Sequence, residues 1–161
     1  MYKRQSVALI VLVLPPDTID VDPSISGVLV PRLCGLDVTA VSFASHKWPA
    51  LAPDGRQILR VSVGRRTHIE WQARTDAELI DSVRTDLATI FDTAVPKGPA
   101  VVTRWMDSLP QFEVGHDDRM TRVDTALADA PGLHVSGAWR FGLGLPACVQ
   151  TAQDCVQMIS A

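Results

Sequence analysis

The sequence predicts an α+β fold: a mostly antiparallel sheet with packed helices, followed by a strand–glycine loop–helix segment. Up to residue 64, short apolar runs alternate with polar links, which is typical of an antiparallel meander. Between residues 75 and 91, apolar side chains recur with the period of a helix. Near the end, glycines at 137, 142 and 144 separate an apolar run from a second helical stripe.

The first strand is predicted from Val7–Leu14, the most apolar run of the chain. Its β-branched residues favour a buried strand. Lys3 and Arg4 precede it, so a secretory signal peptide is the alternative interpretation. The run meets Pro15-Pro16 without a small-residue cleavage site, and it is far too short to span a membrane. We therefore expect a strand, and a cytoplasmic protein with at most peripheral membrane association.

The next elements follow from the same patterns. Strands are predicted at Val28–Val30, Leu36–Ser45 and Ile58–Gly64. Thr75 to Glu78 has the sequence of a capping box, which begins a helix. The apolar stripe of that helix consists of Leu79, Ile80, Val83, Leu87, Ile90 and Phe91.

The second half of the sequence is predicted to contain two strands and two helices. Ala100–Trp105 is expected to be a strand, and Met120, Val123 and Leu127 mark a helix that Pro131-Gly132 stops. Leu133–Gly137 is expected to be a short buried strand. Pro146 suits the first turn of a final helix. Its apolar stripe consists of Val149, Ala152, Val156 and Ile159.

Composition limits the classes of function. The 161 residues are 47% hydrophobic and 20% charged, as in an ordinary soluble globular protein with one core. A net charge of −3 without a Lys/Arg run argues against a nucleic-acid partner. Cys148 and Cys155 lie seven residues apart on one predicted helix, about 10 Å along its axis, so we expect reduced thiols. No Cys/His cluster has zinc spacing, so we expect no metal.

The glycine segment has two interpretations. Gly142-x-Gly144-x-x-Ala147 fits a loose dinucleotide fingerprint. That fingerprint needs a following strand and an acidic residue about 20 residues on. The sequence stops at Ala161, so we do not expect an independent Rossmann unit. The segment is then either a structural turn or a ligand loop, in which the helix N-terminus binds an anionic group.

Several segments resemble one family in order. Gly137–Val149 resembles the C-terminal flavin-contacting segment of protoporphyrinogen oxidases, which reads approximately A-G-x-x-Y-x-G-x-G-x-P-x-C-I. Trp105–His116 resembles the family's W-x-x-x-L-P-Q-Y-x-V-G-H. Ser26–Arg32 resembles G-x-G-F-L-V-P, Ser42–Pro49 resembles T-F-S-S-x-K-W-P, and Arg60–Arg65 matches another family strand. Together these segments span nearly the whole chain.

The resemblance implies an oxidoreductase of haem and porphyrin biosynthesis with FAD as cofactor and a tetrapyrrole substrate. Hydride would leave a tetrapyrrole methylene for the flavin, and oxygen or a quinone would reoxidise it. Because the cofactor carries this chemistry, the resemblance names no catalytic residue. The flavin contacts that it implies are Trp105, Gly137, Gly142, Leu143, Gly144, Leu145 and Pro146. The alternatives are a core tryptophan at Trp105 and a simple turn at the glycines. His116 is expected to be a surface or helix-cap residue.

The resemblance also implies a division of the chain. Residues 1–104 would be part of a substrate-binding domain, and residues 105–161 a C-terminal FAD-binding segment. The family's N-terminal half, with the glycine loop for the FAD pyrophosphate, is not in this sequence, so a missing half is an implied partner. One rival is another FAD amine oxidase, such as a phytoene desaturase relative, against which Lys47-Trp48-Pro49 and Leu109–Phe112 argue. A second rival is a non-catalytic remnant module.

Overall fold

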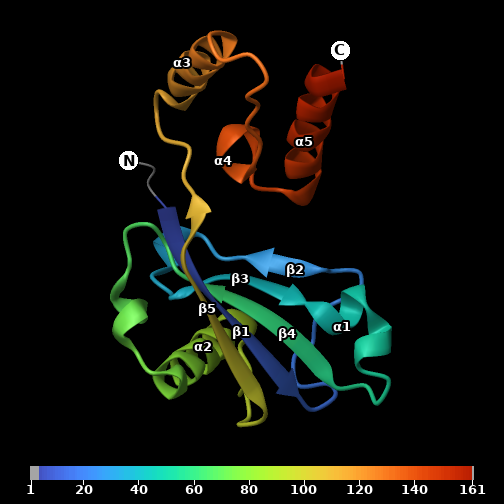
Figure 1. Cartoon of the computed structure of the whole chain (residues 1–161). Coiled ribbons are helices and arrows are strands. Elements are labelled where there is room, and N and C mark those ends of the chain that lie inside the picture. The colour runs from blue at the N-terminus through green and yellow to red at the C-terminus, as the bar shows by residue number, and fades with distance from the viewer. Residues whose placement is uncertain (1–3, 161) are drawn as a thin grey trace. The chain divides into compact units, whose positions relative to one another are not determined.

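The computed structural model describes residues 4–160 (Figure 1). The chain forms two compact units. The sheet unit comprises Ser6–Met106, and the helical unit comprises residues 4–5 and 107–160.

A five-stranded antiparallel sheet dominates the sheet unit (Figure 1). The strand order is β2-β3-β4-β1-β5. The bounds are β1 Arg4–Leu14, β2 Gly27–Leu29, β3 Val38–Phe43, β4 Gln57–Val63 and β5 Ala100–Pro110. Val61 of β4 pairs with Ile10 of β1 on one side and with Val41 of β3 on the other. The predicted meander is therefore confirmed for β2, β3 and β4, and the α+β class is confirmed.

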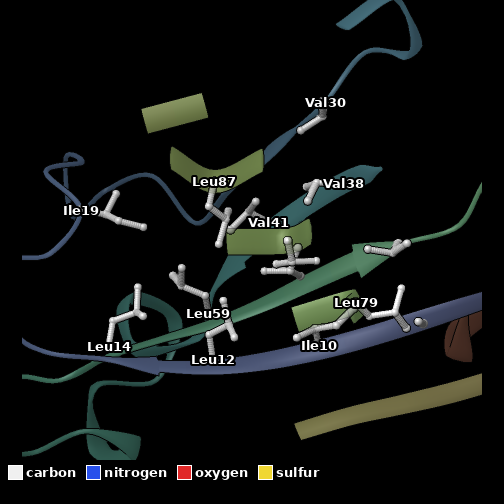
Figure 2. Packing of buried hydrophobic residues seen from close by; sticks show 14 of the residues in the cluster. Ile10, Leu12, Leu14, Ile19, Val30, Val38, Val41, Leu59, Leu79 and Leu87 are labelled. Carbon is white, nitrogen blue, oxygen red and sulfur yellow. The ribbon is translucent and has the colours of Figure 1, made fainter. Parts of the chain in front are cut away.

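One face of the sheet carries the core (Figure 2). From Gln5 to Leu14 of β1, half-buried and buried residues alternate strictly, because successive side chains of a strand point to opposite faces. Ile10 and Leu12 are completely buried on the core face. Helix α2 (Asp76–Phe91) covers this face and buries Leu79, Val83 and Leu87 of its predicted stripe.

The predicted capping box begins α2. The Glu78 amide donates to Thr75 Oγ1 at 3.3 Å, and the Thr75 amide donates to the Glu78 carboxylate at 2.7 Å. At the other end, Asp92 adopts the left-handed conformation that ends many helices. Short helical turns fill the links between strands: η1 Arg32–Cys34, α1 Ala44–Lys47, η2 Pro49–Leu51 and η3 Glu70–Ala73.

Two carboxylates tie α2 to the start of β3. Asp86, which is almost completely buried, accepts from the Val38 amide at 2.9 Å, and its burial raises the pKa of that carboxyl. Asp37 pairs with Arg74 and accepts from the Ser82 hydroxyl at 2.7 Å. Although burial opposes it, these two contacts hold the pKa of Asp37 below its ordinary value.

The helical unit contains α3 (His116–Ala128), α4 (Ala138–Phe141) and α5 (Leu145–Ser160). The predicted helices at α3 and α5 are confirmed. The predicted strand at Leu133–Gly137 is wrong, because no strand of the described residues pairs with it. Instead, the Val135 carbonyl accepts from the Arg140 guanidinium at 3.0 Å and from the Cys155 thiol at 3.3 Å. Side chains thus replace the strand partner that a backbone acceptor needs.

The apolar stripe of α5 does not face a core within the described residues. Val149, Val156 and Ile159 are all more than half exposed, whereas Thr151 and Cys155 are the buried residues of the helix. The periodicity was therefore sufficient to predict the helix, but not which face the helical unit buries.

Candidate functional site

The glycine segment is more regular than the predicted loop. Gly137, with a φ of 136°, precedes the single helical turn of α4, and Gly142 follows it. The Arg140 amide donates to the Gly137 carbonyl at 3.1 Å, which closes this turn. The prediction of a loop is thus wrong for residues 138–141. They form a helical turn, in which the bond from the Arg140 amide satisfies the Gly137 carbonyl.

The second part, residues 142–146, forms what we call the glycine turn. A Cβ at Gly142 would lie 2.7 Å from the Ala147 Cβ, so no larger residue fits without a shift. A Cβ at Gly144 would meet only the Pro146 ring at 3.7 Å, an ordinary contact. The Gly144 carbonyl accepts from the Cys148 amide at 3.1 Å, which makes Gly144 the N-cap of α5.

The glycine turn is open on its outer side. Leu143, Gly144, Leu145 and Pro146 are exposed, and Leu145 is 82% exposed. The first-turn amides of α5 and two apolar side chains therefore share one accessible surface. Helix N-termini carry partial positive charge, and leucine side chains suit a flat aromatic ring. The residues present thus fit the ring of a flavin.

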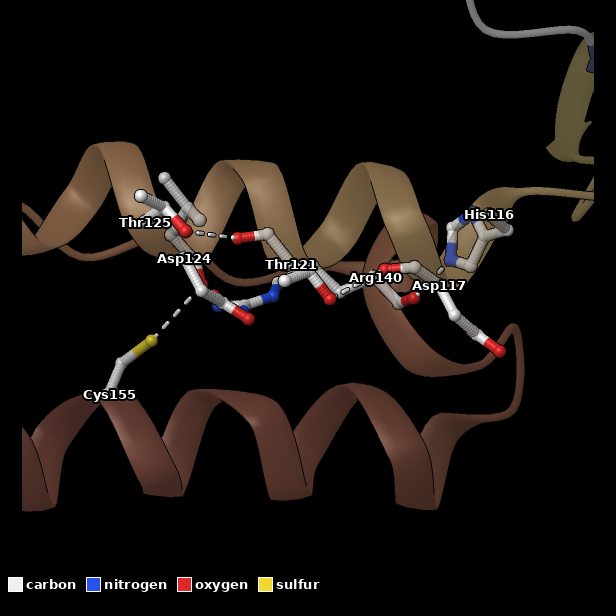
Figure 3. Close-up of polar contacts among 8 residues, drawn as sticks. His116, Asp117, Thr121, Asp124, Thr125, Arg140 and Cys155 are labelled. Atoms are coloured by element: carbon white, nitrogen blue, oxygen red, sulfur yellow. Dashed lines mark hydrogen bonds and ion pairs between the residues drawn. The ribbon is translucent and has the colours of Figure 1, made fainter.

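A buried polar network connects α4 to α3 and to the segment before α4 (Figure 3). Arg140 is 8% exposed, pairs with Asp124 of α3 and donates to the Val135 carbonyl. Its own carbonyl accepts from Nε2 of His116 at 2.6 Å. His116 is the first residue of α3, but it is buried and stacks on Phe112 with ring centroids 4.2 Å apart. We expected His116 to be a surface or helix-cap residue, and its burial shows that this expectation is wrong. The sequence alone gave no signal that Arg140 is buried.

The face of the sheet opposite α2 carries the remaining predicted residue, Trp105. Arg104, its neighbour in β5, turns toward α2 and pairs with Asp76 at 2.6 Å. The alternation of a strand therefore places Trp105 and Val101 on the opposite face. Trp105 is 51% exposed, so it is not a core tryptophan of the described chain.

This opposite face, which we call the open face, has two parts. Alternate residues of β1, among them Leu9 and Val11, are only half-buried there and make one part apolar. Over β2, β3 and β4 the same face contains a pocket of about 290 Å³ that Lys47 and Arg60 line together with Ser42 and Ser62. Within residues 4–160, neither Lys47 nor Arg60 forms an ion pair with a carboxylate. The open face thus combines an apolar surface with two cations.

Two further kinds of site are absent from residues 4–160. No three His, Cys, Asp or Glu side chains come close enough there to share a metal ion. Within the same range, no helix has the length and apolar character that a membrane span requires. The described cysteines are free thiols, with Cys34 exposed and Cys155 buried.

Comparison with known proteins identifies the family. Residues 6–160 match the family of flavin-containing amine oxidoreductases. The chain belongs to this family. Among curated relatives, it is 32% identical to the coproporphyrinogen III oxidase of Bacillus subtilis over 152 residues, which cover 94% of this chain and 32% of the relative. It is 35% identical to the Mycobacterium leprae coproporphyrinogen III oxidase, over 97% of this chain and 33% of that protein. It is 30% identical to the chloroplastic protoporphyrinogen oxidase of Oryza sativa, over 83% of this chain and 26% of that protein.

Solved structures agree with this assignment. A structure from Exiguobacterium sp. 255-15, provisionally assigned as a protoporphyrinogen oxidase, superposes with a TM-score of 0.80 at 30% identity. The superposed region covers 99% of this chain and 35% of the Exiguobacterium chain. Reduced UDP-galactopyranose mutase superposes with a TM-score of 0.62 at 14% identity, which shows a shared fold only. The suspected family is confirmed, and the chain spans about a quarter to a third of the length of these curated relatives.

Proposed function

We propose that this chain is the C-terminal portion of an FAD-dependent porphyrinogen oxidase of haem biosynthesis. The observation that carries the proposal is the open face, which combines apolar β1 and β5 side chains with Lys47 and Arg60 in a member of the flavin amine oxidoreductase family. A porphyrinogen is a large apolar ring with carboxylate side chains. An apolar surface flanked by cations suits both of its parts.

The two segments predicted from the sequence would have different tasks. We propose that residues 1–104 form part of the substrate-binding domain and that residues 105–161 form the last FAD-binding segment. FAD, when bound, supplies the acceptor for a hydride from the tetrapyrrole. The first-turn amides of α5 would stabilise negative charge at the edge of the flavin ring. Leu143 and Leu145 would pack on the ring and exclude water, and Gly142 and Gly144 would let the backbone approach it.

The proposed contacts from this segment are those implied by the sequence: Gly137, Gly142, Leu143, Gly144, Leu145 and Pro146, with Trp105 from the sheet unit. No residue is proposed as an acid or base, because hydride transfer to a flavin leaves the proton chemistry to substrate and solvent. We also propose that a further, N-terminal part of the enzyme binds the pyrophosphate of FAD, as the resemblance to the family implies. We further propose that the enzyme is cytoplasmic and at most peripherally attached to a membrane.

Two porphyrinogens are candidate substrates of the proposed enzyme. The sequence pattern indicated protoporphyrinogen, whereas both bacterial relatives above are named coproporphyrinogen III oxidase. Coproporphyrinogen carries more carboxylates than protoporphyrinogen. Lys47 and Arg60, which form no ion pair within residues 4–160, would bind such additional carboxylates, so coproporphyrinogen is the second candidate substrate.

A chimera tests the function. This chain would replace the matching third of the Bacillus subtilis enzyme, and bound flavin and porphyrin fluorescence would be measured with each porphyrinogen. We expect retained FAD and oxidation of at least one substrate. Arg60→Gln should raise the KM for coproporphyrinogen more than that for protoporphyrinogen. Arg56→Gln is the matched control, because Arg56 pairs with Asp54 at 2.6 Å and does not line the open-face pocket.

Two results would count against the proposal. A soluble, folded chimera without flavin would show that this segment does not complete an FAD site. Equal effects of Arg60→Gln and Arg56→Gln on both substrates would show that the open face does not bind the tetrapyrrole. A folded, flavin-free chimera would favour the rival of a non-catalytic module.

A further inference from the structure

The open-face pocket lies where β2, β3 and β4 carry small side chains. Ser42 of β3 is paired with Gly27 of β2 on one side and with Arg60 of β4 on the other. In the next row on the same face, Ala40 of β3 is paired with Ser62 of β4. Because paired side chains stand next to one another on the sheet, the small members of these two rows leave a hollow in its surface.

Gly27 keeps one side of this hollow empty. A Cβ at Gly27 would overlap with the Val41 carbonyl oxygen, a backbone atom of the paired strand. The position therefore accepts no side chain, and the space beside Ser42 stays open. The pocket has a volume of about 290 Å³, which is that of about ten water molecules in the liquid. It can hold a short carboxylate arm, but not a whole tetrapyrrole ring.

Four polar side chains line the open-face pocket without partners of their own. Within residues 4–160, the hydroxyl groups of Ser42 and Ser62 form no hydrogen bond. Within the same range, Lys47 and Arg60 form no ion pair. No acidic side chain of the described residues contributes to the lining. The pocket therefore presents two cations and two hydroxyl donors, a combination that favours an anion.

The pocket borders directly on the apolar part of the open face. Arg60 is paired with Val11 of β1, and Ser62 is paired with Leu9. A flat ring that packs on the half-buried Leu9 and Val11 would therefore have its edge at the cations and hydroxyl groups. A carboxylate arm at that edge, rather than the ring itself, would enter the pocket.

We propose that the open-face pocket is a subsite for one carboxylate arm of the tetrapyrrole, and that Ser42 and Ser62 determine which porphyrinogen is preferred. The inference rests on the proposed oxidase function and names the residues that discriminate between its two candidate substrates. The hydroxyl groups would donate to the carboxylate oxygens, while Lys47 and Arg60 would supply the charge. An apolar substituent would displace water from these donors without replacing its hydrogen bonds, which lowers affinity. The subsite therefore favours coproporphyrinogen over protoporphyrinogen.

Binding of the oxidised, fluorescent porphyrins to the chain tests the subsite without a flavin. Coproporphyrin and protoporphyrin would each be titrated with the chain, and their dissociation constants measured by fluorescence anisotropy. We expect coproporphyrin to bind about tenfold more tightly, and the double substitution Ser42→Ala and Ser62→Ala to abolish this preference, because both hydrogen bonds to a charged group are lost. Thr103→Val is the matched control. Thr103 is exposed on the open face of β5 and does not line the pocket, so the loss of its hydroxyl group should leave the preference unchanged.

A substitution that fills the pocket tests its size. Ser62→Val suits a strand, so the fold should be kept, and it should weaken coproporphyrin binding about tenfold with little effect on protoporphyrin. In the chimera, the same substitution should raise the KM for coproporphyrinogen relative to that for protoporphyrinogen. Equal affinities of the unmodified chain for the two porphyrins, no binding of coproporphyrin, or a preference that survives the serine substitutions would overturn the subsite. A folded chimera without flavin would instead refute the proposed oxidase function, whereas the porphyrin affinities of the chain would still decide the subsite.

Discussion

Replacing Gly144 by Asp separates the two roles that the glycine turn can have. Gly144 is the N-cap of α5, and a side chain there meets only the Pro146 ring at an ordinary 3.7 Å. Asp is a better N-cap than Gly by a few tenths of a kcal/mol, and its charge suits a helix N-terminus. We therefore expect the free energy of unfolding of the chain to stay constant or to rise by about 0.3 kcal/mol. The melting temperature should rise by about 1–2 °C at most.

The same carboxylate should oppose a bound flavin. Two like charges about 4 Å apart near a protein surface repel by about 4 kcal/mol, which corresponds to a roughly thousandfold loss of affinity for the anionic, reduced flavin. The assay is the flavin absorbance of the purified Bacillus subtilis chimera with and without the substitution. Gly144→Ala is the matched control, since it adds the Cβ without the charge, and it should lose much less flavin than Gly144→Asp.

The two measurements can fail separately. A Gly144→Asp chimera that retains its flavin and oxidises a porphyrinogen would show that Gly144 is only a turn residue. A melting temperature lowered by several degrees in the chain alone would show instead that the N-cap argument is wrong.

Further predictions concern the chain by itself. Thr75→Ala should lower the free energy of unfolding by about 1 kcal/mol because it removes the cap of α2, as urea titration can measure; an unchanged midpoint would contradict this. Because its pKa is raised in the folded chain, protonated Asp86 stabilises the fold. This stabilisation is complete at pH values below the ordinary pKa of 3.8, and it is lost as the pH rises through the raised pKa. Asp86→Asn keeps an acceptor for the Val38 amide but cannot ionise, so the free energy of unfolding should fall less with rising pH in this variant. Identical dependence of the free energy of unfolding on pH in the two proteins would refute the argument. The chain purified with added FAD should be colourless in a visible spectrum, because residues 4–160 contain no strand–loop–helix unit that binds a pyrophosphate, and stoichiometric flavin bands would contradict this. The exposed stripe of α5 should bind an apolar dye and promote association in light scattering, and Val156→Lys should reduce both; a monomer that binds no dye would count against an accessible stripe.

Local patterns predicted the sheet and its helix well because the relevant partners are close in sequence or repeat regularly. The alternation in Val7–Leu14 sets the core face of β1, and the capping box at Thr75 sets the start of α2. The strand predicted at Leu133–Gly137 failed because a strand also needs a neighbour, and the Val135 carbonyl receives side-chain donors instead. Apolar composition alone does not reveal this.

The candidate sites were predictable to different degrees. Spacing and resemblance selected the glycine turn, because its glycines are local requirements of the backbone. The Arg140 network was not predictable, since it joins Arg140 of α4 with Asp124 of α3, and the sequence does not show how these two helices pack. Burial of a charged or polar group depends on which segments meet, and this information is absent from any single window of sequence.

The bond between the Cys155 thiol and the Val135 carbonyl makes the helical unit accessible to chemical kinetics. Cys34 is exposed and should react with a thiol reagent at the rate of an unprotected side chain. Cys155 is buried, so its modification requires that α5 first separate from residues 133–136. The ratio of the two labelling rates therefore measures the free energy of this local opening without unfolding the sheet. A ligand or a further polypeptide that orders the helical unit would be detected as slower modification of Cys155 at an unchanged rate for Cys34.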